Sequence, residues 1–543
     1  MKDVVNVKKG AHMVNASKPA WIFSCGVLAV LMLATAMRFY GLSEPYLWFD
    51  EAFSILLSRH APEQIFSITA RDIHPPLYYV FLHYWIEWWG DSKFAVRSMS
   101  VVFGVGNVAL IIWLTRLASN RNTALLAGTL VALLPLALRY SQEARMYVLA
   151  AFFLLGATLA LFYWVKAPNR RRYLVIYTLL ISASFYTHYI SFACVLSHWL
   201  YLLLLGQRQE GQPHYLMRPS WWLANVFVVV LYAPWLYSIL DLVTHFDTFL
   251  GEGGLAWIAP PSLNRLPLIF WVTLTARTGK DEYWLFYILL PAVLFLMALR
   301  VAYRDQHPGL FKMGLVIYTM LPLFVLFLIS LIKPIFVERY LFFALTCLPI
   351  LVALIVDSLR RRVWKFFVVL SVIALQLNGA AVIYEREEEY YGNRQNSRFA
   401  IEPLSDEIAR RSRPGDYIVV EGSYWFLALV YYNQTTTQPQ VYHPGAPTYH
   451  ASGYGSSALF SPYTDQVYLR SLRVLPDGGC RIWWVVSTDT KTIIPTRWKE
   501  LFQRPFGIVS LHLLVTPPSA DGAACPPAPQ IRDPALGKVP LRE

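Results

Sequence analysis

Charged side chains are scarce in this sequence. Asp, Glu, Lys and Arg together make up 15% of its 543 residues, whereas 56% of the residues are hydrophobic. In soluble domains about a quarter of the residues are charged. The scarcity of charge therefore excludes an ordinary soluble enzyme, and the length leaves room for many membrane spans and a further domain.

Cysteine is also scarce, with five residues in the chain. There is no CxxC or His-rich spacing of the kind that holds structural zinc, so no such site is predicted. Cys480 and Cys525 both fall in the polar carboxy-terminal tail. An oxidising compartment would permit a disulfide between them, and two unrelated thiols are the alternative.

Long apolar runs are what the sequence has in abundance. Runs of the roughly 17 to 25 residues that cross a hydrocarbon core of about 30 Å recur between residues 20 and 384. They predict an all-α polytopic membrane domain with about eleven transmembrane helices. The predicted spans lie near residues 20–39, 94–116, 123–139, 145–165, 173–187, 189–206, 220–240, 283–300, 313–332, 340–357 and 364–384.

Basic residues gather in the loops on one side of these predicted spans, as in 166–172 and 360–365. Because positive loops stay in the cytoplasm, we expect a multi-pass protein of the inner or plasma membrane with a cytoplasmic amino terminus. The net charge of +13 is explained by these loops facing anionic membrane lipid, so no nucleic-acid partner is predicted. The first run is expected to be a signal anchor and not a cleaved signal peptide.

The predicted organisation has three parts, namely residues 1–19 in the cytoplasm, a transmembrane domain over 20–384 and an extracytoplasmic domain over 385–543. Within the second part, residues 41–93 form a long first outer loop, whose aromatic-rich segments are expected to lie as helices in the membrane interface. In the third part, YIVVEG, RIWWVVS and GIVSLHLLV are strand patterns. They predict a small α/β domain, with a Pro-rich end after Thr516.

The stretch PYLWFDEAFSILLSR in the first outer loop places Asp50 beside Glu51. Adjacent residues of a helix point about 100° apart, so the two carboxylates cannot share one face. One is expected to work and the other to support it. A carboxylate at a partly desolvated membrane boundary suits a general base or a cation ligand, and stabilisation of a helix dipole is the alternative.

Further polar residues fall on the same outer side of the predicted membrane domain. The two prolines of IHPPL hold His74 near a helix start, where a ligand contact and simple interfacial packing both stay open. The turn RYSQEARMY carries Arg139, Glu143 and Arg145. These charges either form an internal ion pair or leave one arginine for an anionic ligand.

Two more outer-side segments are FYTHYIS, with His188 and Tyr189, and FVERYLF, with Arg339 and Tyr340. Interfacial anchoring is the alternative for each. A ring of charges beneath an aromatic first loop suits an amphiphilic substrate with an anionic head and a lipid tail, because arginine binds phosphate oxygens bidentately.

The order of the motifs WFDEA, HPPL, SQEARMY, YTHY and ERYLFFALTCLP resembles bacterial members of the protein O-mannosyltransferase-like family, which is glycosyltransferase family 39 of the GT-C class. The resemblance covers most of residues 20–385. It implies an inverting enzyme that moves a sugar from a polyprenyl-phosphate donor to a glycan, lipid or protein acceptor on the outer face of the membrane. The tail does not resemble the β-trefoil domain of the eukaryotic members, so a protein acceptor has no support from it.

The resemblance also implies roles for single residues. Asp50 matches the catalytic aspartate and Glu51 its supporting neighbour, while Arg145 and Arg339 would neutralise the leaving phosphate. His74 would hold the donor head or a divalent cation, which makes Asp50 and His74 the candidate metal ligands, and no other cofactor is expected. The related lipid A aminoarabinose transferases have a lysine where this chain has His74. The expected substrate-binding set is completed by Glu143, His188, Tyr189 and Tyr340.

A transporter or flippase of polyprenyl-linked lipids is the competing prediction, and a non-catalytic membrane scaffold is a third. Transporters commonly have internal repeats, broken helices and polar groups near mid-membrane. This sequence has no evident repeat, and its ionisable residues gather at the outer boundary. Both observations favour the enzyme.

Overall fold

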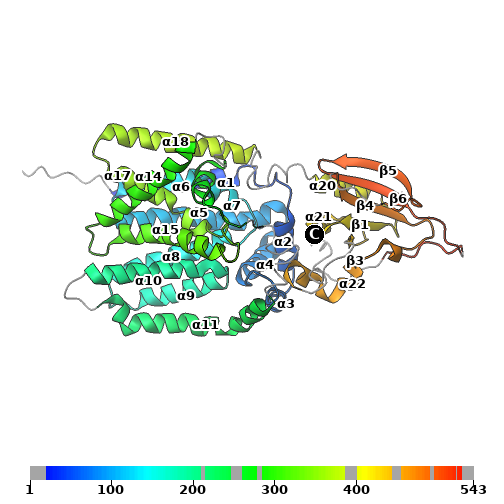
Figure 1. Ribbon diagram of the computed structural model, residues 1–543, viewed down its shortest axis with the longest axis horizontal. Coiled ribbons are helices and arrows are strands. Elements are labelled where there is room, and N and C mark those ends of the chain that lie inside the picture. Colours follow the sequence, from blue (N-terminus) through cyan, green and yellow to red (C-terminus); the bar gives the residue numbers. More distant parts are fainter. Residues whose placement is uncertain are drawn as a thin grey trace, which may run out of the picture.

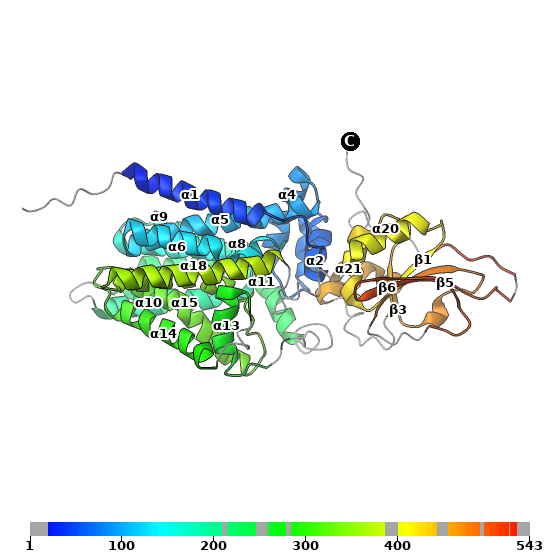
Figure 2. The same cartoon turned by 90° about the horizontal axis from the view of Figure 1, so that it is seen from above.

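A helical bundle and a smaller sheet region make up the structure, a computed structural model (Figure 1). It describes residues 20–208, 214–245, 258, 260–277, 284–385, 400–442, 454–488, 494–520 and 522–528. The sheet region lies beyond one end of the bundle, and short helices of the first outer loop lie between the two (Figures 1 and 2).

The bundle is built from apolar helices, and each predicted span overlaps one or two of them. Eight helices of the described residues are long and apolar enough to cross a membrane, or up to nine if a bent pair forms one span. The eight are α1 (Ala20–Phe39), α5 (Lys93–Ala118), α8 (Tyr147–Lys166), η1 (Tyr189–Ser191) continuing into α10 (Phe192–Arg208), α11 (Pro219–Thr244), α14 (Trp284–Tyr303), α15 (Phe311–Ser330) and α18 (Arg362–Tyr384).

The remaining predicted spans are broken or short. Helices α6 (Arg121–Leu133) and α7 (Pro135–Ser141) meet at 58°, because Pro135 has no N–H to continue the helix and Leu134 before it is extended. Shorter apolar helices are α9 (Arg172–Phe185) and the pair α16 (Phe342–Leu345) and α17 (Leu348–Ser358).

One helix lies outside all of the predicted spans. Helix α13 (Arg265–Thr275) lies within the segment between α11 and α14, and its residues from Leu268 to Thr275 are all buried. Its apolar stretch is too short to cross a membrane, so a search for spans overlooks it.

The first outer loop folds into three helices across the end of the bundle. They are α2 (Phe49–Ser58), α3 (Pro62–Thr69) and α4 (Leu77–Trp89). The basic loops between α5 and α6, α8 and α9, and α17 and α18 lie at the opposite end of the bundle, away from the sheet region (Figure 1). The clustering of basic loops at one end agrees with the predicted topology, and the compartment that each end faces stays a prediction.

The sheet region contains one six-stranded sheet in the order β3-β2-β1-β4-β6-β5. Strands β3, β2, β1 and β4 are parallel to one another. Strand β6 is antiparallel to both of its neighbours, β4 and β5. The strands are β1 (Tyr417–Glu421), β2 (Gln440–Tyr442), β3 (Tyr468–Leu469), β4 (Arg481–Ser487), β5 (Lys499–Phe506) and β6 (Val509–Val515). Three of them were predicted. The other three strands were not predicted, because β2 and β3 are very short and β5 is an exposed edge strand with a polar sequence.

Helices α20 (Ile401–Arg411) and α21 (Ser423–Tyr432) cover one face of the sheet. The buried side chains between these helices and the sheet belong to the same hydrophobic core as those of the bundle. A second core, with Trp484 at its centre, covers the other face. There the Cys480–Cys525 disulfide joins β4 to the carboxy-terminal segment, so the two cysteines are bonded to each other. Short elements complete the region, namely η3 (Gly455–Tyr463), α22 (Thr464–Val467) and η4 (Leu472–Val474), while η2 (Tyr215–Met217) precedes α11 in the bundle.

Polar contacts fasten the sheet region to the first outer loop. The backbone N–H of Leu47 donates to the hydroxyl oxygen of Tyr432 (3.1 Å), and Lys93 Nζ pairs with Glu402 Oε2 (2.6 Å). These contacts hold α21 directly over α2, the helix that carries the Asp-Glu pair.

Candidate active site

Glu51 points into the protein and is fully engaged there. Its side chain is 1% exposed and accepts two hydrogen bonds from Arg97, each 2.8 Å long. The backbone N–H of Ala144 donates a third, to Oε1 (2.9 Å). Arg97 also donates to the backbone oxygens of Leu42 and Pro45. The pair is buried and closed, and it ties the start of α2 to α5 and to the turn before α8.

Asp50 points the other way, as the helical geometry predicts for its neighbour. Its side chain is 24% exposed, and Oδ2 lies 3.3 Å from Arg339 Nη1 and 3.7 Å from Arg145 Nη2. Arg339 comes from the link between α15 and α16, and Arg145 comes from the turn between α7 and α8. Three segments far apart in the sequence thus bring one carboxylate and two guanidinium groups to the same place.

Arg145 occupies the space between Asp50 and His74. Its Nη1 donates to the backbone oxygen of Asp50 and to Ser54 Oγ, both at 3.2 Å, and its Nη2 lies 3.5 Å from His74 Nε2. A divalent cation held by Asp50 and His74 would therefore face a guanidinium group. The described residues also contain no group of three or more His, Cys, Asp or Glu side chains arranged for a metal. The residues at Asp50 do not fit the cation that the resemblance allowed.

Two histidines lie beside the arginines. His74 Nδ1 is 3.4 Å from Asp72 Oδ2, and the His188 ring lies 6.1 Å from the His74 ring and 5.3 Å from the Tyr340 ring. Burial lowers the pKa of His74 despite the nearby Asp72 carboxylate. Burial also lowers the pKa of His188, and repulsion from His74, when that ring is protonated, and from Arg145 adds to this effect. Both rings are therefore neutral at pH 7.

Two predicted binding residues make their contacts elsewhere. Glu143 Oε1 pairs with Arg139 Nη2 at 2.6 Å, which is the internal ion pair that the sequence left as one alternative. The hydroxyl oxygen of Tyr189 accepts a hydrogen bond from Trp235 Nε1 (3.0 Å), on the side of α11. Their roles toward a substrate stay predictions, while Asp50, His74, Arg145, His188, Arg339 and Tyr340 lie together.

Several residues at the site were not among the predicted ones. Tyr147 lies between Arg145, whose Cζ is 5.9 Å from the Tyr147 ring centre, and His188, whose ring is 5.8 Å away. Asp72 faces His74. Both stand within two residues of a predicted one, in SQEARMY and RDIHPP, so inspection of the neighbours within these motifs could have found them.

Buried polar atoms around Asp50 lack partners among the described residues. They are Trp48 Nε1, Tyr79 Oη, Arg145 Nε and His188 Nε2. A buried donor or acceptor without a partner costs about 1 to 3 kcal/mol, so native proteins keep few of them. Four such atoms beside one partly exposed carboxylate favour a polar ligand at this place.

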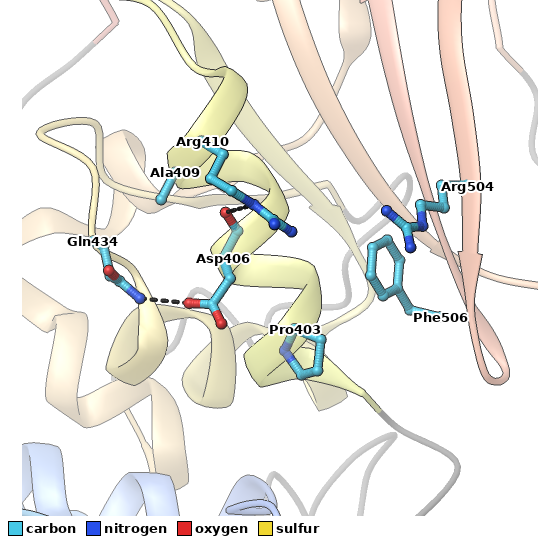
Figure 3. Close-up of a pocket in the computed structure, with 7 residues that line it drawn as sticks. All are labelled: Pro403, Asp406, Ala409, Arg410, Gln434, Arg504 and Phe506. Atoms are coloured by element: carbon cyan, nitrogen blue, oxygen red, sulfur yellow. Dashed lines mark hydrogen bonds between the residues drawn. The ribbon is translucent and has the colours of Figure 1, made fainter.

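A separate hollow of about 460 Å³ lies on the sheet region between α20 and β5 (Figure 3). Arg410 and Arg504 line it, and Gln434 Nε2 donates to Asp406 Oδ1 (2.6 Å). Both arginines pair with the buried Glu407, at 2.7 and 3.3 Å. Their charges are thus partly neutralised, and none of the predicted site residues lines this hollow. The candidate site is therefore the cluster around Asp50.

The fold is that of the GT-C class of membrane glycosyltransferases, as the resemblance implied. Residues 73–237 match the family model described as dolichyl-phosphate-mannose-protein mannosyltransferase. This segment carries His74, Arg145 and His188.

Two solved structures are similar over nearly the whole chain. ArnT from Cupriavidus metallidurans in the apo state has a TM-score of 0.64 and 14% identity, covering 92% of this chain and 99% of that one. The same protein bound to undecaprenyl phosphate has a TM-score of 0.60 and 13% identity, covering 94% of this chain and 100% of that one. No curated protein sequence matches the chain significantly.

Proposed function

We propose that the protein is a glycosyltransferase that moves a sugar from a polyprenyl-phosphate-linked donor to an acceptor at the outer face of the membrane. The observation that carries the proposal is the partly exposed Asp50 carboxylate facing the guanidinium groups of Arg339 and Arg145. A base and two phosphate-binding groups at the boundary of a membrane domain suit a lipid-linked donor with an anionic head. The GT-C fold supports the same class, since ArnT of this fold binds undecaprenyl phosphate.

Asp50 acts as the general base in this proposal. One carboxylate oxygen of Asp50 takes the proton of the acceptor hydroxyl, and the hydroxyl oxygen of the acceptor attacks the anomeric carbon of the donor sugar. The bond from the anomeric carbon to the phosphate oxygen breaks, and polyprenyl phosphate leaves with the electron pair. A single displacement of this kind inverts the anomeric carbon.

Arg339 and Arg145 stabilise the leaving phosphate. Negative charge develops on the phosphate oxygens as the bond breaks, and two preorganised guanidinium groups lower the energy of that state more than that of the intact donor. Glu51 and Arg97 hold the start of α2, so Asp50 stays aligned with the arginines without movement of the helix. The arginines supply the positive charge at this place, and we propose that transfer needs no divalent cation.

The lipid tail of the donor needs an apolar surface next to the site. An apolar cavity of about 290 Å³ lies among α13, α14 and α15, with Phe270, Phe295 and Leu323 in its wall. Helix α15 ends at Ser330, and Arg339 follows it in the link to α16. A cavity of this kind supports a polyprenyl donor over a water-soluble nucleotide sugar.

The test uses purified protein in lipid vesicles and a panel of labelled polyprenyl-phosphate sugars that includes hexoses and pentoses. The proposal predicts release of free polyprenyl phosphate together with a new glycosidic product. Movement of intact donor across the vesicle membrane without bond cleavage would favour the transporter and contradict the proposal. The absence of both cleavage and movement for the whole panel would leave the scaffold as the surviving prediction.

A further inference from the structure

Helix α21 of the sheet region brings a tyrosine against Phe49, the residue next to Asp50. The Tyr424 ring lies parallel to the Phe49 ring, with 6.3 Å between the ring centres and 9° between the planes. Phe49 directly precedes Asp50 on α2, and α21 lies next to α2 between the bundle and the sheet (Figure 2). The carboxy-terminal region therefore contributes a side chain at the same place as the first outer loop.

Tyr424 remains accessible although its helix is mostly buried. Its side chain is 43% exposed, whereas Phe426 and Leu427 of the same helix are almost fully buried in the core. Trp425 contacts the Tyr424 ring edge-on, with ring centres 4.6 Å apart. An exposed aromatic ring and a partly exposed carboxylate thus stand together, and core packing does not explain the exposed ring.

The charges of Asp50 and Arg339 affect the pKa of Tyr424. Partial burial raises the pKa of Tyr424 to about 12, and the negative charge of Asp50 contributes to the rise while Arg339 opposes it. The phenol therefore stays neutral at physiological pH. Both charged groups thus act on the Tyr424 hydroxyl, in agreement with the contact of its ring with Phe49.

Trp48 supplies a second aromatic surface, next to Arg339. Its ring centre lies 5.9 Å from Arg339 Cζ. The indole Nε1 is buried and has no hydrogen-bond partner among the described residues. Indole N–H groups in such positions normally donate to an oxygen, so a ligand oxygen is the expected partner.

We propose that Tyr424 and Trp48 form the acceptor subsite and that the acceptor is a carbohydrate, whose sugar ring lies against Tyr424 and presents a hydroxyl to Asp50. A sugar ring has apolar C–H faces and a rim of hydroxyl groups. The exposed aromatic ring matches the faces, and the indole N–H and the carboxylate match the rim. This inference rests on the proposed function and names the acceptor class of that same site.

The test measures transfer by the purified full chain with oligosaccharides and alkyl glycosides as acceptor probes. Tyr424→Leu keeps a side chain of apolar character but removes the aromatic face, so the acceptor KM should rise about tenfold, the factor expected for a lost aromatic contact. Tyr424→Phe keeps the face and should stay within about twofold of the wild type. Trp48→Phe keeps a ring but removes the indole N–H, and the acceptor KM should rise about fivefold. In Tyr424→Leu and Trp48→Phe the donor KM should change much less than the acceptor KM.

Three results would overturn the inference. An acceptor KM of wild-type size in both Tyr424→Leu and Trp48→Phe would remove these residues from the subsite. Equal changes in the donor and acceptor KM would indicate a structural role for Tyr424. Transfer to Ser- or Thr-containing peptides in preference to every glycoside would contradict the carbohydrate class. Failure of the proposed function is distinguishable from all three, because the wild type would then release no polyprenyl phosphate with any donor or acceptor.

Discussion

Two carboxylates that are neighbours in the sequence stand in opposite kinds of environment. The Glu51 cluster is closed, since Arg97 and a backbone N–H occupy the carboxylate from all sides and its side chain is 1% exposed. The Asp50 cluster is open, since two arginines approach the carboxylate at 3.3 and 3.7 Å and leave it 24% exposed. The difference teaches that a buried carboxylate whose hydrogen bonds are all made inside the protein stabilises the fold. A carboxylate that stays partly exposed beside two arginines is accessible to a substrate.

The Arg139–Glu143 pair sharpens this comparison. The pair comes from the same turn as Arg145 and is also buried. Arg139 Nη2 and Glu143 Oε1 lie 2.6 Å apart, so these two side chains pair with each other and not with Asp50. Arg145, two residues after Glu143, makes its contacts to Asp50, Ser54 and His74. Position at the membrane boundary is therefore not enough to identify a functional charge, and the contacts of each charged side chain have to be known.

The largest expected effect comes from breaking the closed cluster. Glu51→Gln leaves the Arg97 guanidinium buried with an uncompensated charge, which costs about 3 to 5 kcal/mol of folding free energy. Thermal unfolding in detergent should show a large loss of stability or no folded protein. Asp50→Asn is the matched control and should lose much less stability, because the Asp50 side chain is 24% exposed and Arg145 keeps its hydrogen bonds to the Asp50 backbone oxygen and to Ser54. Equal losses in both variants would abolish the distinction between the clusters.

Removing an arginine from the open cluster should weaken binding and leave the fold intact. Arg339→Ala removes charge-assisted hydrogen bonds worth about 1.5 to 3 kcal/mol, so the Kd for polyprenyl phosphate should rise roughly 10- to 150-fold. Arg339→Lys keeps the charge without the planar fork and should lose less. Equilibrium binding of labelled polyprenyl phosphate provides the measurement. An unchanged Kd in the alanine variant would exclude Arg339 from the phosphate site.

The neutral histidines predict a modest pH effect on stability. Both His74 and His188 have a pKa below the ordinary value of 6.5, mainly because of burial. As the pH falls below about 6.5, the unfolded chain binds protons at these rings before the folded protein does, so stability falls, by at most about 1.4 kcal/mol per pH unit for each ring. Unfolding temperatures at pH 7 and 5.5 measure this, and His188→Gln should reduce the difference. A stability that rises toward pH 5.5 would contradict neutral histidines.

The smallest expected effect is that of metal removal. Arg145 fills the space where a cation bound by Asp50 and His74 would lie. Dialysis against EDTA should therefore leave the rate of sugar transfer unchanged. A loss of activity that added Mg²⁺ or Mn²⁺ restores would show that the open cluster recruits a cation despite its arginines.

Local patterns in the sequence were enough to predict most of the fold. Apolar runs predicted the helices of the bundle, and alternating or continuous apolar stretches predicted β1, β4 and β6. Helix α13 and the edge strand β5 could not be predicted in this way. The first is too short for a span, and the second has a polar sequence because its side chains face solvent.

In the candidate site, too, the sequence predicts what depends on neighbouring residues and does not predict contacts between distant segments. The 100° step between Asp50 and Glu51 correctly predicts that they face different ways. Which of the two faces inward depends on Arg97, in a helix whose sequence does not point to Glu51. Tyr424 reaches the site only because the sheet region docks on α2, and nothing near it in the sequence indicates that contact.

Comparing Asp50→Asn with the wild type tests the central claim most directly. The substitution keeps the size of the side chain and removes the base, so binding of polyprenyl phosphate should persist while transfer falls about 10²- to 10⁴-fold, the range of general base catalysis. Both quantities should be measured on the same folded preparation, with release of polyprenyl phosphate as the readout. Transfer at the wild-type rate by Asp50→Asn would contradict the assignment of the open carboxylate as the base.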